Sequence, residues 1–239
     1  MLPVERSLTK RAACLRMLPV THDNTPHDVI GEHPLASLLA VLARMVSGVQ
    51  VRWLDCEPST HQRIYFANHS SHLDTLVLWA ALPAEARALL RPVAAQDYWD
   101  RAGLRRYVSQ RVFHAVLIQR HPSPDQRSLA AAQAVIEKLI EAMGERHSLL
   151  VFPEGTRGSG DDVVPFKSGL YHLALGKPEA ELVPVYLENL NRTLPKGELL
   201  PVPVLTSATF GRPLRVEPGE SKQAFLERAR ELVRGLRPR

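Results

Sequence analysis

The sequence predicts an α/β fold, in which a mixed, largely parallel central sheet is flanked by helices and preceded by an amphipathic helix. Short apolar runs of strand length recur from residue 49 onward. Several of them are separated by segments with apolar residues at intervals of three and four, which is the period of a half-buried helix. Strands that alternate with helices in this way are typical of a sheet covered by helices. With 239 residues, 45% of them hydrophobic and 23% charged, the chain can bury a substantial core.

The N-terminal region divides into two parts. Residues 1–33 contain scattered prolines, histidines and charges without periodicity, and we expect a mobile N-terminal arm. Residues 34–50 predict an amphipathic helix, because their large apolar residues recur at helical intervals. These residues are Leu35, Leu38, Leu39, Leu42, Met45 and Val46. Two roles for the apolar face remain open, namely contact with a membrane interface and packing on the core of the protein.

Residues 51–239 form the main domain. The expected strands are residues 49–54, 64–67, 115–118, 149–152, 183–187 and 205–210. A helix is expected over residues 74–82, and a second begins with Ser123-Pro124-Asp125-Gln126, which offers a capping hydroxyl, a proline and a capping-box glutamine. This second helix is expected to end at Gly144. A basic helix with apolar residues between Phe225 and Leu236 ends the chain. Residues 189–203 are either a loop over the functional site or a solvated connection.

Composition narrows the class of partner. The formal net charge is +5 and the isoelectric point is about 9.5, which suits an anionic partner such as lipid headgroups or phosphates. No motif supports nucleic-acid binding, and net charge alone is not sufficient for it. The only two cysteines, Cys14 and Cys56, favour a reducing compartment without a disulfide framework. The most apolar N-terminal stretch meets Arg44 after about ten residues, short of the roughly 20 that cross a bilayer. We therefore expect no transmembrane span and no signal peptide.

One candidate site follows the expected strand at residues 64–67. It reads Asn68-His69-Ser70-Ser71-His72-Leu73-Asp74. A histidine serves as a general base when another group fixes its orientation, and Asp74 can do this for His69 if a turn leads into a helix whose first turn contains Asp74. Two alternatives remain open. His69 and His72 could bind a metal with Asp74, or the polar residues could simply cap the helix.

A second candidate site follows the strand at residues 149–152. It reads Phe152-Pro153-Glu154-Gly155-Thr156-Arg157. Glycine allows the backbone to approach a ligand closely, Thr156 adds a hydroxyl donor, and Arg157 can bind a phosphate with two hydrogen bonds. Lys167 adds a second cation. The alternative is a strand that ends in a turn with a surface salt bridge.

These motifs, in this order, resemble the four signature blocks of the glycerolipid acyltransferases, which include the bacterial 1-acyl-glycerol-3-phosphate acyltransferases. The first block is residues 69–74, and the second is the expected strand that ends in Arg120. The third is Phe152 to Arg157, and the fourth is Val183-Pro184-Val185. The resemblance covers roughly residues 50 to 215.

The resemblance implies a reaction and a set of site residues. His69 would act as general base on the free hydroxyl of a lysophospholipid, which attacks the thioester of acyl-CoA or acyl-acyl carrier protein, and Asp74 would orient the imidazole. The acceptor's phosphate and glycerol would be bound by Arg120, Glu154, Gly155, Thr156 and Arg157. No metal or organic cofactor is implied. A peripheral location on the cytoplasmic face of the inner membrane follows, with the helix at 34–50 and the basic C-terminal helix as membrane contacts.

Three further interpretations remain open. The acceptor can be lysophosphatidate, giving phosphatidate, or another lysolipid. The chain can be a non-catalytic, lipid-binding member of the same fold. It can also be a hydrolase that uses the same base to activate water.

Overall fold

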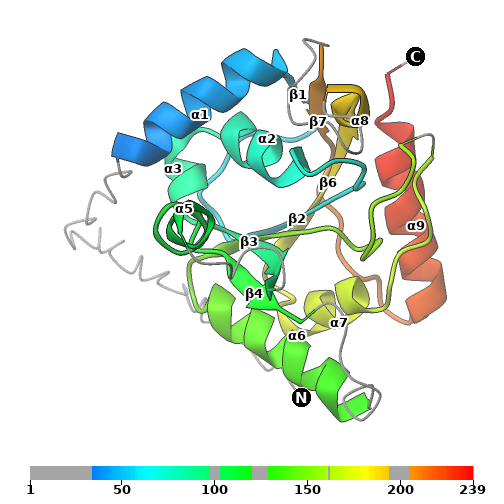
Figure 1. Ribbon diagram of the computed structural model, residues 1–239. Helices are drawn as coiled ribbons and strands as arrows, with labels where there is room; N and C mark the ends of the chain where they lie inside the picture. Colours follow the sequence, from blue (N-terminus) through cyan, green and yellow to red (C-terminus); the bar gives the residue numbers. More distant parts are fainter. Residues whose placement is uncertain (1–33, 97–102, 120–128, 161, 194–204, 239) are drawn as a thin grey trace, which may run out of the picture.

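The computed structural model describes residues 34–96, 103–119, 129–160, 162–193 and 205–238. The predicted arm at 1–33 and the predicted helix start at 123–126 therefore lie outside the described residues. Within the described part, the chain forms one seven-stranded sheet between two layers of helices (Figure 1). The strands are β1 (Gln50–Trp53), β2 (Arg63–Ala67), β3 (Leu90–Ala95), β4 (Val116–Ile118), β5 (Ser148–Val151), β6 (Glu181–Glu188) and β7 (Ser207–Phe210).

The sheet is mixed and mostly parallel, as predicted. Its strand order is β1-β7-β6-β2-β5-β3-β4. Every neighbouring pair is parallel except β6 and β7. Strands β1 and β7 thus run against the other five, so both begin at the edge where β2, β5 and β6 end. In register, Ser207 at the start of β7 lies opposite Glu188 at the end of β6.

Two hydrophobic cores lie on the two faces of the sheet. Alternate residues of a strand point to opposite faces, and β2 accordingly sends Tyr65 and Ala67 into one core, and Ile64 and Phe66 into the other. The first core is covered by α1 (Pro34–Ser47), α2 (Asp74–Ala81) and α3 (Ala84–Ala88). The second is covered by α6 (Leu129–Met143), α7 (Gly169–Gly176) and α9 (Lys222–Gly235). Shorter elements are α5 (Leu104–Tyr107), η1 (Val108–Val112) and α8 (Leu190–Thr193).

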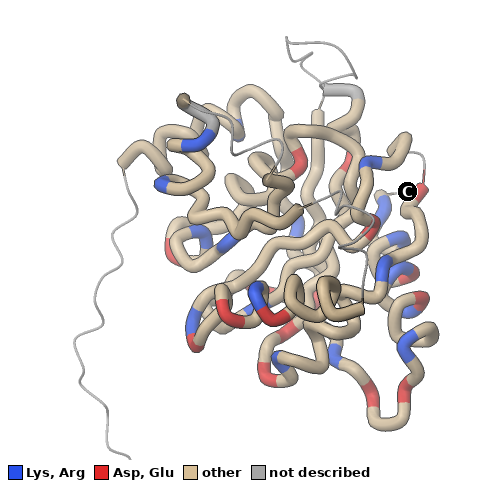
Figure 2. Tube along the Cα trace, turned by 60° about the horizontal axis from the view of Figure 1, so that its bottom comes forward, with Lys and Arg blue, Asp and Glu red and all other residues tan. Residues whose placement is uncertain are grey.

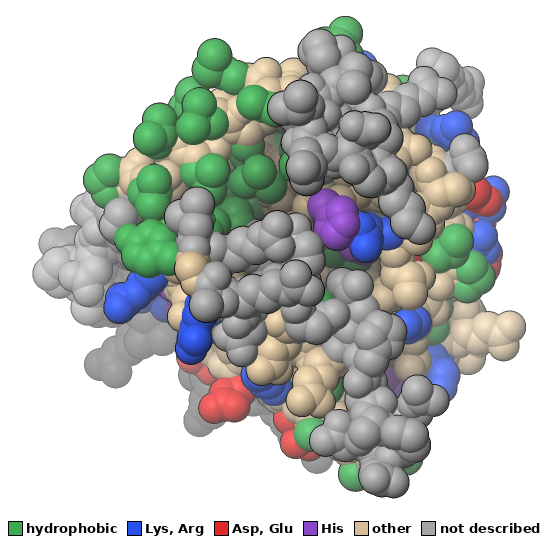
Figure 3. Space-filling view, viewed as in Figure 1, with side chains coloured by type: hydrophobic (Ala, Val, Ile, Leu, Met, Phe, Trp, Pro, Cys, Tyr) green, Lys and Arg blue, Asp and Glu red, His purple; other side chains and the backbone are tan. Residues whose placement is uncertain are grey.

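The fully buried residues of helix α1 are all small. Ala36, Ala40, Ala43 and Ser47 are buried, while Leu35 and Leu39 are partly buried against the core. Its remaining large apolar side chains are exposed: Leu38 by 55%, Val41 by 53%, Leu42 by 48%, Met45 by 74% and Val46 by 47%. We call these five residues the α1 apolar surface. Figure 3 shows hydrophobic side chains gathered over this helix.

Arg44 fixes α1 on α2. Its side chain donates to the carbonyl oxygens of Ala80 (2.6 Å) and Leu82 (3.1 Å) at the end of α2. These carbonyls have no partner within the helix, and a cation is favourable at a helix C-terminus. The arginine that interrupts the apolar stretch in the sequence is therefore part of the packing of this helix.

Every predicted strand is confirmed, but several elements were not predicted. The prediction missed β3, whose residues Leu90 to Ala95 include Pro92, because proline disfavours an interior strand. It also missed the short helices and α7, which begins at Gly169. Gly144 follows α6 with a φ of +48°, as expected for the residue that ends a helix.

Helix α9 is basic, but several of its arginines are used within the protein. Arg228 pairs with Glu220, Arg230 with Glu227, and Arg234 with both Asp162 and Glu231. Figure 2 shows acidic and basic positions mixed along the part of the chain that leads to the C terminus. Much of the positive charge of α9 is therefore paired within the protein. In addition, α9 covers the face of the sheet opposite to α1.

Candidate active site

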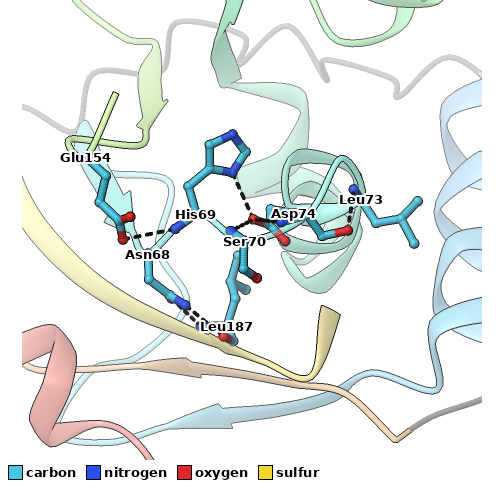
Figure 4. A network of polar contacts seen from close by, with 8 residues as sticks. Asn68, His69, Ser70, Leu73, Asp74, Glu154 and Leu187 are labelled. Atoms are coloured by element: carbon cyan, nitrogen blue, oxygen red, sulfur yellow. Dashed lines mark hydrogen bonds and ion pairs between the residues drawn. The ribbon is translucent and has the colours of Figure 1, made fainter. Parts of the chain in front are cut away.

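Both predicted motifs lie at the same edge of the sheet. Strands β2 and β5 are parallel neighbours, and Phe66 lies in register with Val151. The residues that follow these strands therefore emerge side by side, at the edge where α/β folds bind ligands. Asn68 fixes the first of them to β6. Its Nδ2 donates to the carbonyl of Leu187 (2.9 Å), and its Oδ1 accepts from the Leu187 N–H (2.7 Å), as Figure 4 shows.

His69 and Asp74 form the predicted pair. The Nδ1 atom of His69 lies 2.8 Å from Oδ2 of Asp74. The same carboxylate oxygen accepts from the N–H groups of Ser70 (2.6 Å) and Ser71 (2.9 Å). Asp74 is fully buried and begins α2, where a negative charge is favourable. The prediction of a turn that leads into a helix, with Asp74 in the first helical turn, is therefore confirmed.

The imidazole is fixed on a second side by an aromatic ring. The rings of His69 and Phe152 are stacked, with centroids 4.2 Å apart and planes inclined by 20°. Phe152 follows β5, so this contact joins the two motifs. Because Asp74 occupies Nδ1, the other ring nitrogen, Nε2, is the one that can exchange a proton with a bound molecule.

Glu154 contacts the main chain of His69. Its side chain is buried, with 4% of the residue exposed, and Oε1 accepts the backbone N–H of His69 at 3.1 Å. The pKa of Glu154 is raised from 4.5 to about 7, chiefly by burial and in addition by the nearby charge of Asp74, which together outweigh the lowering effects of the hydrogen bond from His69 and the charge of Arg230. The carboxyl is therefore poised to titrate near neutral pH.

Gly155 allows Lys167 to cross the turn. Its φ is +70°, a conformation that favours glycine. A Cβ at this position would lie 2.5 Å from Nζ and 2.7 Å from Cε of Lys167, so a larger residue would displace that side chain. The backbone N–H of Lys167 donates to the carbonyl of Pro153 (2.8 Å). Thr156, Arg157 and Lys167 are all exposed. The turn thus presents two cations and a hydroxyl to solvent.

The structure brings together most of the predicted site. His69, Asp74, Glu154 and Gly155 lie in one connected group, with Lys167 packed against Gly155. Arg157 precedes Gly158, whose N–H donates to the carbonyl of His69 at 2.8 Å. Arg120 lies outside the described residues, two positions beyond the end of β4. Within the described ranges, no group of three or more His, Cys, Asp or Glu side chains could hold a metal ion.

Two residues that shape the site, Asn68 and Phe152, were given no specific role from the sequence. Asn68 was noted only as part of its motif, yet its side-chain amide takes the place of a backbone partner for Leu187 of β6. Phe152 was noted only as part of its motif, yet it stacks on the catalytic candidate. The one hint of the contact between Asn68 and β6 in the sequence is that an amide side chain stands directly before His69, at the end of a strand. No pattern in the sequence shows the ring contact, because it depends on the neighbouring position of β2 and β5.

Comparison with known proteins identifies the family. A family model described as Acyltransferase matches residues 48–188, which is more than half of the chain. The chain therefore belongs to the acyltransferase family, and the resemblance to the glycerolipid acyltransferases is confirmed.

Several curated relatives within this family are named for one reaction. The chain is 26% identical over 176 residues to a 1-acyl-sn-glycerol-3-phosphate acyltransferase of Limnanthes douglasii, covering 70% of this chain and 56% of that protein. It is 28% identical over 167 residues to 1-acyl-sn-glycerol-3-phosphate acyltransferase alpha of Mus musculus, covering 67% and 53%. The chain spans about half the length of these curated relatives.

A solved structure shares the fold. It is the 1-acyl-sn-glycerophosphate (LPA) acyltransferase PlsC from Thermotoga maritima, with a TM-score of 0.63, 20% sequence identity, and coverage of 84% of this chain and 77% of that one. The similarity shows that the mixed sheet and its two helical layers are shared.

Proposed function

We propose that this protein transfers a fatty acyl group from acyl-CoA or acyl-acyl carrier protein to the free hydroxyl of a lysophospholipid. The leading acceptor is 1-acyl-glycerol-3-phosphate, with phosphatidate as the product. The observation that carries the proposal is the 2.8 Å contact between Nδ1 of His69 and Oδ2 of Asp74, beside an exposed turn with two cations. The names of the relatives support the same reaction.

The proposed reaction is a single displacement. Nε2 of His69 accepts the proton of the acceptor hydroxyl while that oxygen bonds to the thioester carbonyl carbon. The carbon–sulfur bond then breaks, and the thiolate takes up the proton to leave as a free thiol. Asp74 holds the ring and stabilises the imidazolium through the contact at Nδ1. No acyl-enzyme forms, and the thioester is already activated, so no cofactor is required.

The exposed turn would bind the acceptor's phosphate. Arg157 and Lys167 supply positive charge, Thr156 supplies a hydroxyl, and Gly155 leaves room for the side chain of Lys167. Arg120, which stood in the predicted set, would add a third cation from the end of β4. The phosphate would anchor the acceptor while its free hydroxyl reaches toward His69.

The test is an acyl-transfer assay with purified protein. Labelled acyl-CoA and acyl-acyl carrier protein are each offered with a panel of lysolipids, and the His69→Ala variant runs beside the wild type. Since a general base contributes on the order of 10²–10⁴-fold in rate, transfer to lysophosphatidate should be almost lost in the variant. Transfer to a different lysolipid would correct the acceptor. Free fatty acid without a new diacyl lipid would indicate a hydrolase, and no turnover would favour a lipid-binding protein.

The α1 apolar surface supports peripheral membrane binding as part of the proposed function. No helix in the described ranges is long and apolar enough to cross a bilayer. However, α1 ends at Ser47, directly before β1, and β1 begins at the edge of the sheet that carries His69. Helix α1 would therefore bring this edge to the lipid surface, at the cytoplasmic face of the inner membrane.

Paired substitutions test this surface. Leu42→Glu with Met45→Glu places two charges on it, whereas Leu129→Glu alters an apolar residue on α6 that is at least as exposed (77%) and lies on the other face of the sheet. Burying each such side chain contributes about 1.5–3 kcal/mol, so binding to anionic liposomes should fall at least ~10-fold in the double variant only. Unchanged sedimentation of the double variant would contradict the proposal.

A further inference from the structure

Glu154 faces the histidine and not the exposed turn. Although its neighbours Thr156 and Arg157 are exposed, the Glu154 side chain is buried. Figure 4 shows its carboxylate directed at the backbone N–H of His69, with Oε1 at 3.1 Å from that nitrogen. A group that binds the phosphate or glycerol of an acceptor has to reach the surface where the acceptor arrives. This carboxylate is turned away from it.

We propose that Glu154 is a positioning residue that holds the main chain of His69, and that it does not bind the acceptor. The proposal rests on the proposed function and changes one of its assignments, because Glu154 was predicted from the resemblance as a ligand of the acceptor.

The segment that contains Glu154 holds His69 at three points. Glu154 accepts its N–H at 3.1 Å, Gly158 donates to its carbonyl at 2.8 Å, and Phe152 stacks on its ring at 4.2 Å. All three partners come from the seven residues that follow β5. The turn that presents Arg157 to the acceptor therefore also sets the φ and ψ angles of the base. Binding of phosphate and orientation of the imidazole are thus functions of one loop.

The charges around Glu154 agree with this role. A carboxylate beside a phosphate would repel it, whereas a carboxyl that is partly neutral avoids this cost. The pKa of Glu154 is raised to about 7, chiefly by burial; Asp74 of α2 and Asp162 of the same loop contribute to the rise, while Arg230 of α9 opposes it. Lys167 crosses Gly155, is exposed, and is available to the acceptor. Glu154 therefore needs to supply only an acceptor oxygen.

Kinetics of three variants separate positioning from binding. Glu154→Ala removes the oxygen that holds His69, Glu154→Gln keeps an oxygen at the same place, and Arg157→Ala serves as the control for acceptor binding. A small displacement of a catalytic group costs on the order of 10²-fold in rate. We therefore expect Glu154→Ala to lower kcat by about that factor with the KM for lysolipid nearly unchanged, and Glu154→Gln to recover at least ~10-fold of the loss. Arg157→Ala should instead raise KM.

A second measurement does not depend on turnover. In ¹⁵N-labelled protein, the amide proton of His69 should shift with pH around 7 in the wild type, as its hydrogen-bond partner ionises. The part of this shift that is due to Glu154 should be lost in Glu154→Gln, so the two pH curves should differ, and the amide should exchange faster with solvent in Glu154→Ala. If the wild type transfers no acyl group but the amide still titrates, the proposed function fails and the positioning contact stands.

Two results would overturn the inference. One is an increase in KM with an unchanged kcat in Glu154→Ala, which would make the carboxylate a ligand of the acceptor. The other is a His69 amide that behaves alike in the wild type and in both Glu154 variants, because the hydrogen bond would then have no consequence for the main chain.

Discussion

Replacing Glu154 by glutamine should change how the stability of the protein depends on pH. In the folded protein burial raises the pKa of this carboxyl from its ordinary value of 4.5 to about 7. Between these two values the folded state binds a proton more tightly than the unfolded state does. Stability is therefore lost as the pH rises through this window. Glutamine cannot ionise, so the stability of the variant should not fall in this way as the pH rises.

The size of the effect follows from the shift. A difference of about 2.5 in pKa, at about 1.4 kcal/mol for each pKa unit, corresponds to at most ~3.5 kcal/mol over the full titration. We expect the free energy of unfolding of Glu154→Gln, relative to the wild type, to be higher by about 2–3 kcal/mol at pH 8 than at pH 5. For a chain of this length, this corresponds to a relative change in Tm of roughly 4–12 °C.

Urea titrations at pH 5, 6, 7 and 8 measure this difference. Any constant cost of placing an amide in the site cancels, because only the change with pH is compared. Glu137→Gln is a matched control, since Glu137 is exposed on α6, and its curve should remain parallel to the wild type. If the difference between wild type and Glu154→Gln changes by less than about 0.5 kcal/mol over the whole range, folding does not raise the pKa of Glu154, and the reasoning would be wrong.

Three further predictions concern the same site. Asp74→Asn should lower kcat on the order of 10²–10⁴-fold in the acyl-transfer assay, because the imidazole of His69 loses its orienting charge; an unchanged kcat would contradict the pair. Asn68→Ala should lower the free energy of unfolding in urea by about 2–3 kcal/mol, because the N–H and C=O of Leu187 both lose their partner, and a loss below ~0.5 kcal/mol would contradict that contact. Gly155→Ala should destabilise by about 1–2 kcal/mol because its φ is +70°, and it should also raise the KM for lysolipid because the side chain of Lys167 must move; a KM equal to that of the wild type would show that this lysine does not bind the acceptor.

The sequence was most informative where one local pattern decides the structure. Apolar runs identified six of the seven strands, and the histidine-aspartate motif identified the turn before α2. Strand β3 escaped because Pro92 lies inside it, and local propensity does not report that Leu150 of β5 pairs with this residue.

In the candidate site, too, contacts between residues close in the sequence were predictable, whereas contacts between distant residues were not. The pairing of His69 with Asp74 spans five residues and was predictable. The contact between Glu154 and His69 spans 85 residues and depends on two strands being neighbours. A motif shows which residue types are present, but it does not show that one carboxylate faces a main-chain N–H while the adjacent arginine faces solvent.

The face of α1 was also not decided by its periodicity. The pattern of leucines predicted an apolar face, but the contact with the core is made by alanines one turn apart. Both the leucines and the alanines recur at helical intervals, so periodicity does not show which of them face the core. The alanines face it because α2 packs close to α1.

The reversed direction of β1 has a consequence for the geometry of catalysis at a surface. Only Gly48 and Val49 separate the end of α1 from the start of β1, and Thr206 ties this junction to β7 by donating to the carbonyl of Ser47. A connection of two residues leaves little freedom for α1 to move relative to the edge of the sheet that carries His69. If α1 rests on a lipid surface as proposed, this short connection would hold His69 at one distance from that surface, and the protein would favour lipid hydroxyls that lie at the same distance.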